Sequence, residues 1–243
     1  MKRGTELLMG LIMLMLVCTI SNNLQLIFAR AEEREKESIP METLVEVSYT
    51  VVLDAGHGGM DGGKVSVDGH LEKDINLSIV MLLKSYLESD GFNVVLTRED
   101  GNGLYSESDE NKKRADMNKR CSIIELARPV CVVSIHQNSY PDKSVRGPQV
   151  FYYKSSEEGR TLAGILQNRL NLLREDEKKR EIKPNTDYYL LKNVSVPIVI
   201  CECGFLSNPD EAAKLIDEKY QQSVAWEIYM GITEYVNTGG VAN

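Results

Sequence analysis

The sequence predicts an α/β protein whose strands pair mainly in parallel. A run of β-branched and aliphatic residues at 47–53 is typical of a buried strand. Apolar side chains then recur three and four positions apart over residues 72–89, which indicates an amphipathic helix, and another apolar run follows at 92–97. Strand, helix and strand in succession favour parallel pairing through a right-handed crossover.

The same alternation continues along the rest of the chain. Pro148 opens one later strand, which we expect nearer an edge of the sheet because proline cannot donate to a central ladder. The charged stretch at 174–187 is expected to be a solvated helix end and loop, or alternatively a groove lip or partner surface. The remaining expected elements are a helix at 114–126, strands at 130–136 and 148–153, a helix at 157–173, strands at 188–191 and 197–204, and helices at 211–217 and 220–236.

Composition limits the classes of protein to consider. With 243 residues and 42% hydrophobic residues, the chain can form one domain of roughly 180–200 residues with an appendage. The net charge of −8 argues against a nucleic-acid-binding protein, which usually presents a basic face.

The N-terminus has the pattern of an export element. Lys2 and Arg3 precede an apolar run at 7–20, which is short for a membrane span and suits the core of a signal peptide. We expect residues 1–31 to be a signal peptide, with Ala29-Arg30-Ala31 as its cleavage site, or an uncleaved membrane anchor. A linker at 32–46, a catalytic domain at 47–237 and a tail at 238–243 follow, and any membrane contact is expected only through the N-terminal segment.

Two of the three histidines stand at equivalent places in the predicted fold. His57 lies in a glycine-rich turn after the first strand, and His136 ends a later apolar strand. Open α/β sheets place their ligands beyond the carboxyl ends of the strands, so both imidazoles are expected at one edge. Glu72 opens the amphipathic helix, and Glu202 interrupts a strongly apolar strand whose end meets the same edge.

Each of these residues also has a plain structural interpretation. A histidine in a turn can be without a chemical task, which is the alternative for His57. An acid in a first helical turn is often only a favourable charge at the helix dipole, which is the alternative for Glu72. A carboxylate inside an apolar strand can belong to a buried ion pair, which is the alternative for Glu202.

Together the four residues form a complete set for hydrolysing an amide. Two imidazoles and one carboxylate, from His57, His136 and Glu72, make a three-ligand zinc site with one open position. Zinc in such a site activates water near neutral pH. A neighbouring carboxylate that does not bind the metal, here Glu202, can take a proton from that water and give it to a leaving amine. The ligands are dispersed along the chain, so their spacing alone is only moderately specific.

Five motifs, in order, resemble those of the zinc-dependent N-acetylmuramoyl-L-alanine amidases of the bacterial cell wall, the amidase-3 type. The similarity extends from about Val47 to Val236. Its short layout, its export element and residues 189–193 look most like the germination-specific branch found in endospore formers. The motifs are Asp54-Ala55-Gly56-His57-Gly58-Gly59, Leu71-Glu72-Lys73-Asp74, Thr97-Arg98, Ser134-Ile135-His136-Gln137-Asn138 and Glu202-Cys203-Gly204-Phe205-Leu206-Ser207-Asn208.

The resemblance implies a fold, a site and a reaction. The fold would be an open, mostly parallel, twisted sheet of about six strands flanked by helices on both faces. One Zn²⁺ would be bound by His57, Glu72 and His136, and Glu202 would be catalytic. The reaction would cleave the amide between N-acetylmuramic acid and the L-alanine of the stem peptide in peptidoglycan. In the germination branch this removes stem peptides from the spore cortex for muramic-δ-lactam formation.

The resemblance also implies a location and a partner. The protein would be exported across the cytoplasmic membrane to the cell wall or spore cortex region, where an activating protein partner is expected. Asn138 is expected to support His136 or to contact substrate. The pair Ile124-Glu125 departs from the Ala-Asn of many relatives and is expected to alter packing or the groove.

Two other functions use the same residues. A zinc peptidase with these ligands would cut within the stem peptide, between two amino acids. A non-catalytic peptidoglycan-binding or activator protein would keep its biological function after Glu202→Gln. The presence of all four site residues argues against the non-catalytic protein, whereas the position of the cut in digested peptidoglycan distinguishes the peptidase from the amidase.

Overall fold

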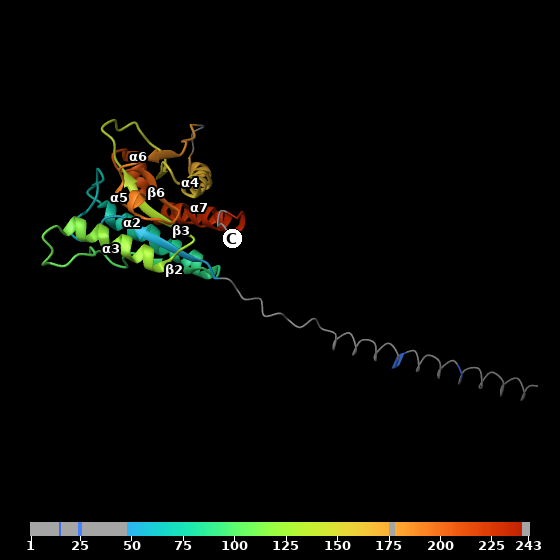
Figure 1. Ribbon diagram of the computed structural model, residues 1–243. Helices are drawn as coiled ribbons and strands as arrows, with labels where there is room; N and C mark the ends of the chain where they lie inside the picture. The colour runs from blue at the N-terminus through green and yellow to red at the C-terminus, as the bar shows by residue number, and fades with distance from the viewer. Residues whose placement is uncertain (1–14, 16–23, 26–47, 175–177, 240–243) are drawn as a thin grey trace, which may run out of the picture. The chain divides into compact units, whose positions relative to one another are not determined.

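A six-stranded sheet lies at the centre of the compact unit Ser48–Asn243 (Figure 1). The computed structural model describes Met15 and residues 24–25, 48–174 and 178–239. The strand order is β2-β1-β3-β6-β4-β5. The strands are β1 (Thr50–Ala55), β2 (Asn93–Leu96), β3 (Cys131–Asn138), β4 (Gln149–Tyr153), β5 (Lys183–Asn185) and β6 (Ile198–Phe205).

The predicted mostly parallel α/β sheet is confirmed. β1 pairs in parallel with both β2 and β3, β3 pairs in parallel with β6, and β5 pairs in parallel with β4. Only the β4–β6 pair is antiparallel among the six strands. Because β1, β3 and β6 are adjacent and parallel, their carboxyl ends meet at one edge of the sheet, as the open α/β rule requires.

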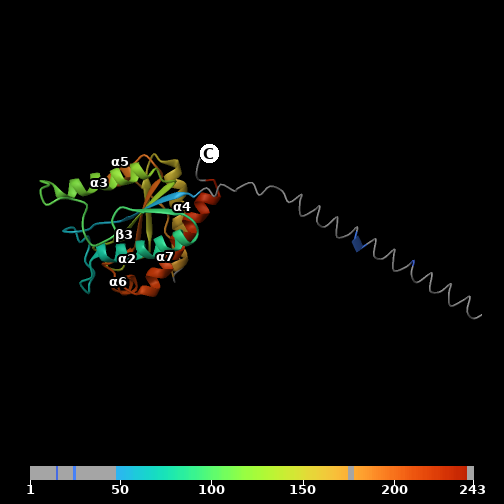
Figure 2. The same cartoon turned by 90° about the horizontal axis from the view of Figure 1, so that it is seen from below.

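Helices cover both faces of this sheet (Figure 2). Along β1, Val51 and Leu53 point into one core and Val52 into the other, which is the period-two alternation of a strand buried on both sides. The first core contains apolar side chains of α2, α4 and α7, and the second contains those of α3 and α5. The helices are α2 (Glu72–Ser89), α3 (Lys112–Ala127), α4 (Glu157–Leu170), α5 (Tyr189–Asn193), α6 (Pro209–Leu215) and α7 (Glu218–Asn237), with a short 3₁₀ turn at Asn171–Leu173.

The α2 helix begins and ends at the residues that the sequence predicts. Its buried positions, among them Ile75, Ile79 and Leu83, recur at helical spacing and face the first core. Gly91 follows with φ +84, a left-handed conformation that favours glycine after a helix. The start of α2 matters for function, because Glu72 is its first residue and lies 1% exposed.

Two local predictions differ from the structure. Residues 188–191 do not form a strand, because Leu190 and Leu191 both pack into the second core from helix α5. A strand would point such neighbours to opposite faces. The charged stretch contains β5, a three-residue strand whose Lys-Pro-Asn sequence carries no strand pattern. The expectation that the strand after Pro148 lies nearer an edge is confirmed, since β4 is next to the outermost strand, β5, which itself contains Pro184.

The predicted signal peptide or anchor and the linker lie almost wholly outside the described residues. Of positions 1–47, only Met15, Leu24 and Gln25 are described. Across the described part of the chain, no helix is both long enough and apolar enough to cross a bilayer.

Candidate metal centre

The turn after β1 presents His57 in an uncommon backbone conformation. His57 has φ +65, in the left-handed region that non-glycine residues seldom adopt. The flanking glycines make the turn possible in different ways. Gly58 has φ +142, and a Cβ at Gly56 would collide with the imidazole of His136. The glycine at 56 therefore lets the two histidines approach each other.

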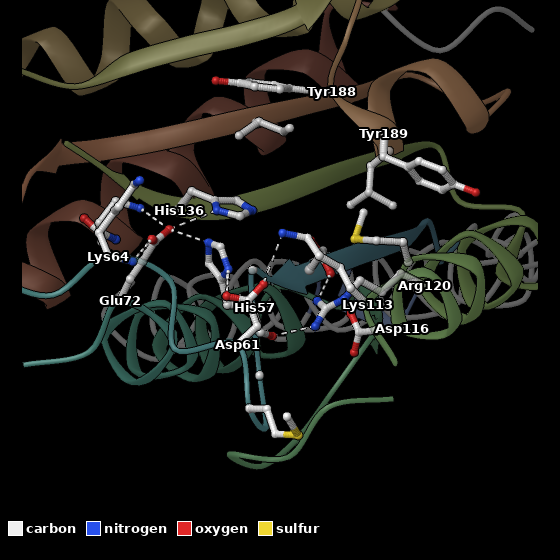
Figure 3. Close-up of a pocket in the computed structure, with 18 of the residues that line it drawn as sticks. His57, Asp61, Lys64, Glu72, Lys113, Asp116, Arg120, His136, Tyr188 and Tyr189 are labelled. Atoms are coloured by element: carbon white, nitrogen blue, oxygen red, sulfur yellow. Dashed lines mark hydrogen bonds and ion pairs between the residues drawn. The ribbon is translucent and has the colours of Figure 1, made fainter. Parts of the chain in front are cut away.

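His57, Glu72 and His136 point toward one another from three different elements (Figure 3). Glu72 Oε1 lies 3.1 Å from His57 Nε2 and 3.0 Å from His136 Nδ1. The two imidazole rings meet edge to face, with centroids 4.9 Å apart. One ligand atom from each residue can be chosen so that all lie within 4.8 Å of one another. The structure thus brings together the three residues that the sequence predicts as metal ligands.

The carboxylate of Glu72 is fixed and ionised. Its Oε1 accepts a hydrogen bond of 3.0 Å from the backbone N of Gln137, and its Oε2 accepts one of 2.7 Å from the backbone N of Lys64. Burial by itself favours the protonated form, but the hydrogen bonds from His136 and His57 outweigh it and hold the pKa of Glu72 well below its usual range. An anionic oxygen is thereby held between two imidazole nitrogens.

Asp61 holds the other side of His57, and the sequence analysis missed it. Asp61 Oδ1 lies 3.0 Å from His57 Nδ1, which leaves Nε2 directed at Glu72. A carboxylate on the far nitrogen of a metal-binding histidine fixes the tautomer and the ring orientation. The signal was available in the sequence, because an acid four residues after a turn histidine is well placed to reach back to its ring.

A buried ion pair lies directly beneath the His57 turn and was also missed. Arg120 of α3 is 1% exposed, and its guanidinium lies 2.5 Å from Asp54 and 2.6 Å from Asp116. Arg120 also donates hydrogen bonds to the backbone carbonyls of Ala55 at 2.8 Å and His57 at 2.5 Å. Burial disfavours the ionised form of Asp54, but Arg120, with Ser134 and Thr97, lowers its pKa to about 2. This pairing joins residues 66 apart in sequence, so no local pattern could reveal it.

Glu202 lies on β6 directly opposite His136 of β3 in the parallel register. It is 9% exposed, and among the described residues its Oε2 has no hydrogen-bond partner. Burial raises its pKa to about 7, with the charge of His136 opposing this effect and that of Glu72 adding to it. Two neighbouring carboxyl groups therefore have pKa values moved in opposite directions, which is typical of residues with different tasks in an active site.

All four residues line one pocket of about 950 Å³. Its walls also include Met60, Lys113, Tyr188 and Tyr189. In the view of Figure 3, Tyr188 lies above His136. Asn138 lines the pocket as well, and its Oδ1 accepts a hydrogen bond of 2.8 Å from the backbone N of Ser139. A role for Asn138 in supporting His136 or contacting substrate stays a prediction.

The departure at Ile124-Glu125 concerns packing rather than the pocket. Ile124 is fully buried in the second core, and Glu125 Oε1 accepts a hydrogen bond of 2.8 Å from the backbone N of Ser195. This pair therefore joins α3 to the segment before β6.

The donor set fits zinc. Two imidazole nitrogens and one carboxylate oxygen are ligands that Zn²⁺ prefers, and three protein ligands leave a position for substrate or water in catalytic zinc sites. The buried Glu202 oxygen without a partner adds a negative group beside the three donors, where a cation would stabilise it. The residues present can therefore hold a metal ion.

Comparison with known proteins agrees with this geometry. The family model described as N-acetylmuramoyl-L-alanine amidase matches residues 51–234. The germination-specific N-acetylmuramoyl-L-alanine amidase of Bacillus subtilis is 37% identical over 193 residues, covering 78% of this chain and 81% of that protein.

Two solved structures are similar in both fold and sequence. The CwlD amidase from Clostridioides difficile, solved in complex with the GerS lipoprotein, is 40% identical with a TM-score of 0.76, covering 79% of this chain and all of that one. The amidase AmiC2 of Nostoc punctiforme is 30% identical with a TM-score of 0.68, covering 78% of this chain and 97% of that one. The resemblance carried by the sequence motifs is confirmed, and the chain belongs to the amidase-3 family of N-acetylmuramoyl-L-alanine amidases.

Proposed function

We propose that this enzyme binds one zinc ion through His57, Glu72 and His136, and that Glu202 is its catalytic residue. The bond cleaved is the amide between N-acetylmuramic acid and the L-alanine of the stem peptide in peptidoglycan. The arrangement of these residues carries the proposal: the three donors lie within 4.8 Å of one another, and Glu202, whose Oε2 has no hydrogen-bond partner among the described residues, faces the same pocket.

The residues of the chain divide the chemistry between them. When bound, zinc acts as a Lewis acid that polarises an amide carbonyl and activates water near neutral pH. Glu202 accepts a proton at Oε2 from the attacking water and then delivers it to the leaving amine nitrogen of L-alanine. A pKa of about 7 suits both transfers, because the carboxyl group gains and loses a proton easily near neutral pH. Asp61 keeps the His57 ring oriented with Nε2 toward Glu72, so that this nitrogen would be available to hold the metal.

The biological setting follows from the relatives. Because the Bacillus subtilis relative is germination-specific, we assign this chain to the removal of stem peptides from the spore cortex, which leads to muramic-δ-lactam and germination. Residues 1–31 export the protein as a signal peptide or anchor, 32–46 are a linker, 47–237 are the catalytic domain and 238–243 a tail. The Clostridioides difficile relative is solved with a lipoprotein, which supports an activating protein partner for this chain as well.

Digestion of purified peptidoglycan tests the reaction. Mass spectrometry should detect free stem peptides that begin with L-alanine, together with glycan strands that carry bare muramic acid. Treatment with a chelator should stop the release, and added zinc should restore it. A cut between two amino acids would identify a stem peptidase instead, and retained stems despite bound zinc would refute hydrolysis.

Two variants separate metal binding from proton transfer. His57→Ala removes a ligand, so zinc content measured by atomic emission should fall together with activity. Glu202→Gln should retain zinc but lose turnover on the order of 1000-fold, the range of general acid–base catalysis. His70→Ala is the matched control, because His70 is exposed and outside the pocket, and it should change neither quantity. Loss of zinc in Glu202→Gln would contradict the assigned role.

A further inference from the structure

The carbonyl of Gly56, the residue before His57, accepts hydrogen bonds from two buried side chains of other elements. Asn76, on α2, donates from Nδ2 to this carbonyl at 3.1 Å. Arg98, in the segment after β2, donates to it from Nη2 at 3.0 Å. Both side chains are buried, Asn76 fully and Arg98 to 3% exposure. We call these two residues the Gly56 clamp.

Arg98 connects the segments that carry two of the metal ligands. The Nη2 that bonds Gly56 also donates at 2.8 Å to the carbonyl of Lys73, the residue after Glu72. Its Nε donates at 2.8 Å to Ala55, and its Nη1 at 2.7 Å to Asp100. All four hydrogen bonds end on backbone carbonyls, so this guanidinium binds the main chain on both sides of the site.

Asn76 connects the remaining ligand segment. Its Nδ2 lies 3.5 Å from Glu72 Oε1, the oxygen between the two imidazoles. Its Oδ1 accepts a hydrogen bond of 3.1 Å from Nε2 of Gln137, the residue after His136. The Gly56 clamp therefore links three residues that are each next to a predicted ligand: Gly56 beside His57, Lys73 beside Glu72, and Gln137 beside His136.

The turn needs such support for two reasons. A left-handed conformation at a non-glycine residue such as His57 is unfavourable, so the surrounding contacts must hold it in place. Burying a guanidinium is also costly unless its donors are satisfied, and four carbonyls at fixed positions satisfy Arg98 only in this arrangement. Lysine at position 98 would keep the charge but not the planar fork that reaches separate carbonyls.

We infer that Arg98 and Asn76 are positioning residues that set the separation of His57 from Glu72, and through it the affinity for zinc. The inference rests on the proposed function, since it presumes that these residues bind the metal. Neither residue is one of the three candidate ligands, and of the two only Asn76 hydrogen-bonds a donor atom, Glu72 Oε1. They determine how closely the metal-free protein already matches the geometry needed to bind zinc.

Zinc affinity of the chelator-stripped protein, measured by competition with a chromophoric chelator, tests the clamp. Arg98→Lys should weaken binding about 10–100-fold, the cost typical of losing an outer-shell partner, and Asn76→Ala about tenfold. The absorption spectrum of the Co²⁺-loaded protein should change in both variants, because the ligand geometry relaxes.

Arg169→Lys is the matched control. Arg169 of α4 pairs at 2.8 Å with Glu227 of α7, away from the pocket, so the substitution should lower the melting temperature yet leave zinc affinity within about twofold. Variants are first checked for a folded far-ultraviolet circular dichroism spectrum, and Asn76→Ala decides the question if Arg98→Lys does not fold. Clamp variants that bind zinc as tightly as wild type would overturn the inference. Wild-type protein that does not bind zinc would instead overturn the proposed function.

Discussion

Two polar clusters pack beside this sheet. One is built mainly from charged side chains and the other mainly from neutral amides. The charged cluster, at the carboxyl ends of β1 and β2, consists of Asp54, Arg98, Asp116 and Arg120. The amide cluster, beside β4, consists of the buried residues Gln149, Gln167 and Asn171, to which the half-buried Arg180 donates from its backbone N and from Nη1.

The amide cluster completes the backbone hydrogen bonding of β4 and of the segment before β5. Gln167 Oε1 accepts from the backbone N of Val150 at 2.8 Å, and its Nε2 donates to the carbonyl of Pro148 at 3.1 Å. Asn171 accepts from the backbone N of Arg180 at 3.1 Å and donates to its carbonyl at 2.9 Å. Neutral amides suffice here, because each can donate and accept at once.

The difference between the two clusters shows where buried charged side chains serve function. Neutral amides satisfy a backbone at modest cost, whereas buried charges are expensive and are kept where the site needs them. The charged cluster touches the turn that carries His57, and the amide cluster touches none of the four site residues through the hydrogen bonds described. Substitutions should therefore affect metal chemistry at one cluster and stability alone at the other.

The largest stability effect should come from Arg120→Met. It leaves Asp54 and Asp116 without their counter-charge in the interior, and breaking a buried pair in this way costs about 3–5 kcal/mol. Urea unfolding measures the change. Arg114→Met, at an exposed position of the same helix, should stay within about 0.5 kcal/mol. Equal effects of the two substitutions would show that the buried charge is not what matters.

Glu202 should make stability fall as pH rises in the metal-free protein. Burial raises its pKa from 4.5 to about 7, so the folded state retains a proton that the unfolded chain releases. This contribution is fully present below pH 4.5 and is lost as pH rises through about 7, a change of about 3 kcal/mol. Unfolding curves of wild type and Glu202→Gln across this range isolate it, since the variant lacks the slope. A parallel pair of curves would refute the raised pKa.

Gln167→Leu should lower stability and leave the metal site unchanged. It leaves the backbone groups of Val150 and Pro148 unpaired, and each buried group without a partner costs about 1–3 kcal/mol. Asn168→Leu, at the next and exposed position of the helix, is the control. Zinc affinity should be unchanged in both. A fall in zinc affinity in Gln167→Leu would end the distinction between the clusters.

The elements and the three candidate metal donors could be predicted because local patterns encode them. The apolar run before His57, the one that ends at His136 and the helical spacing after Glu72 each identify an element without reference to the rest of the chain. The rule that parallel strands present ligands at their carboxyl ends then places the donors together. Burial of Glu202 followed from its apolar neighbours on β6.

Apart from Asp61, the residues that support the donors could not be predicted, because they depend on long-range pairing. α3 carries only Arg120 and Ile124 as buried residues, so its sequence gives little indication of the face that packs. Arg120 and Asp54 meet across 66 positions, and Arg98 and Gly56 across 42. The antiparallel placement of β4 and the helical state of residues 189–193 are likewise decided by packing rather than by local preference.

The outermost strand, β5, has a consequence for how molecules of this enzyme meet. Lys154 donates its backbone N–H to the carbonyl of Asn185, so the backbone groups of Asn185 face β4. Because successive residues of a strand direct these groups to opposite sides, those of Pro184 face away from β4, toward the unpaired edge of the sheet. Proline has no N–H to offer an incoming strand, and the exposed Lys183 beside it carries a charge. One rim of the sheet is thus protected against edge-to-edge growth into aggregates when copies are crowded together.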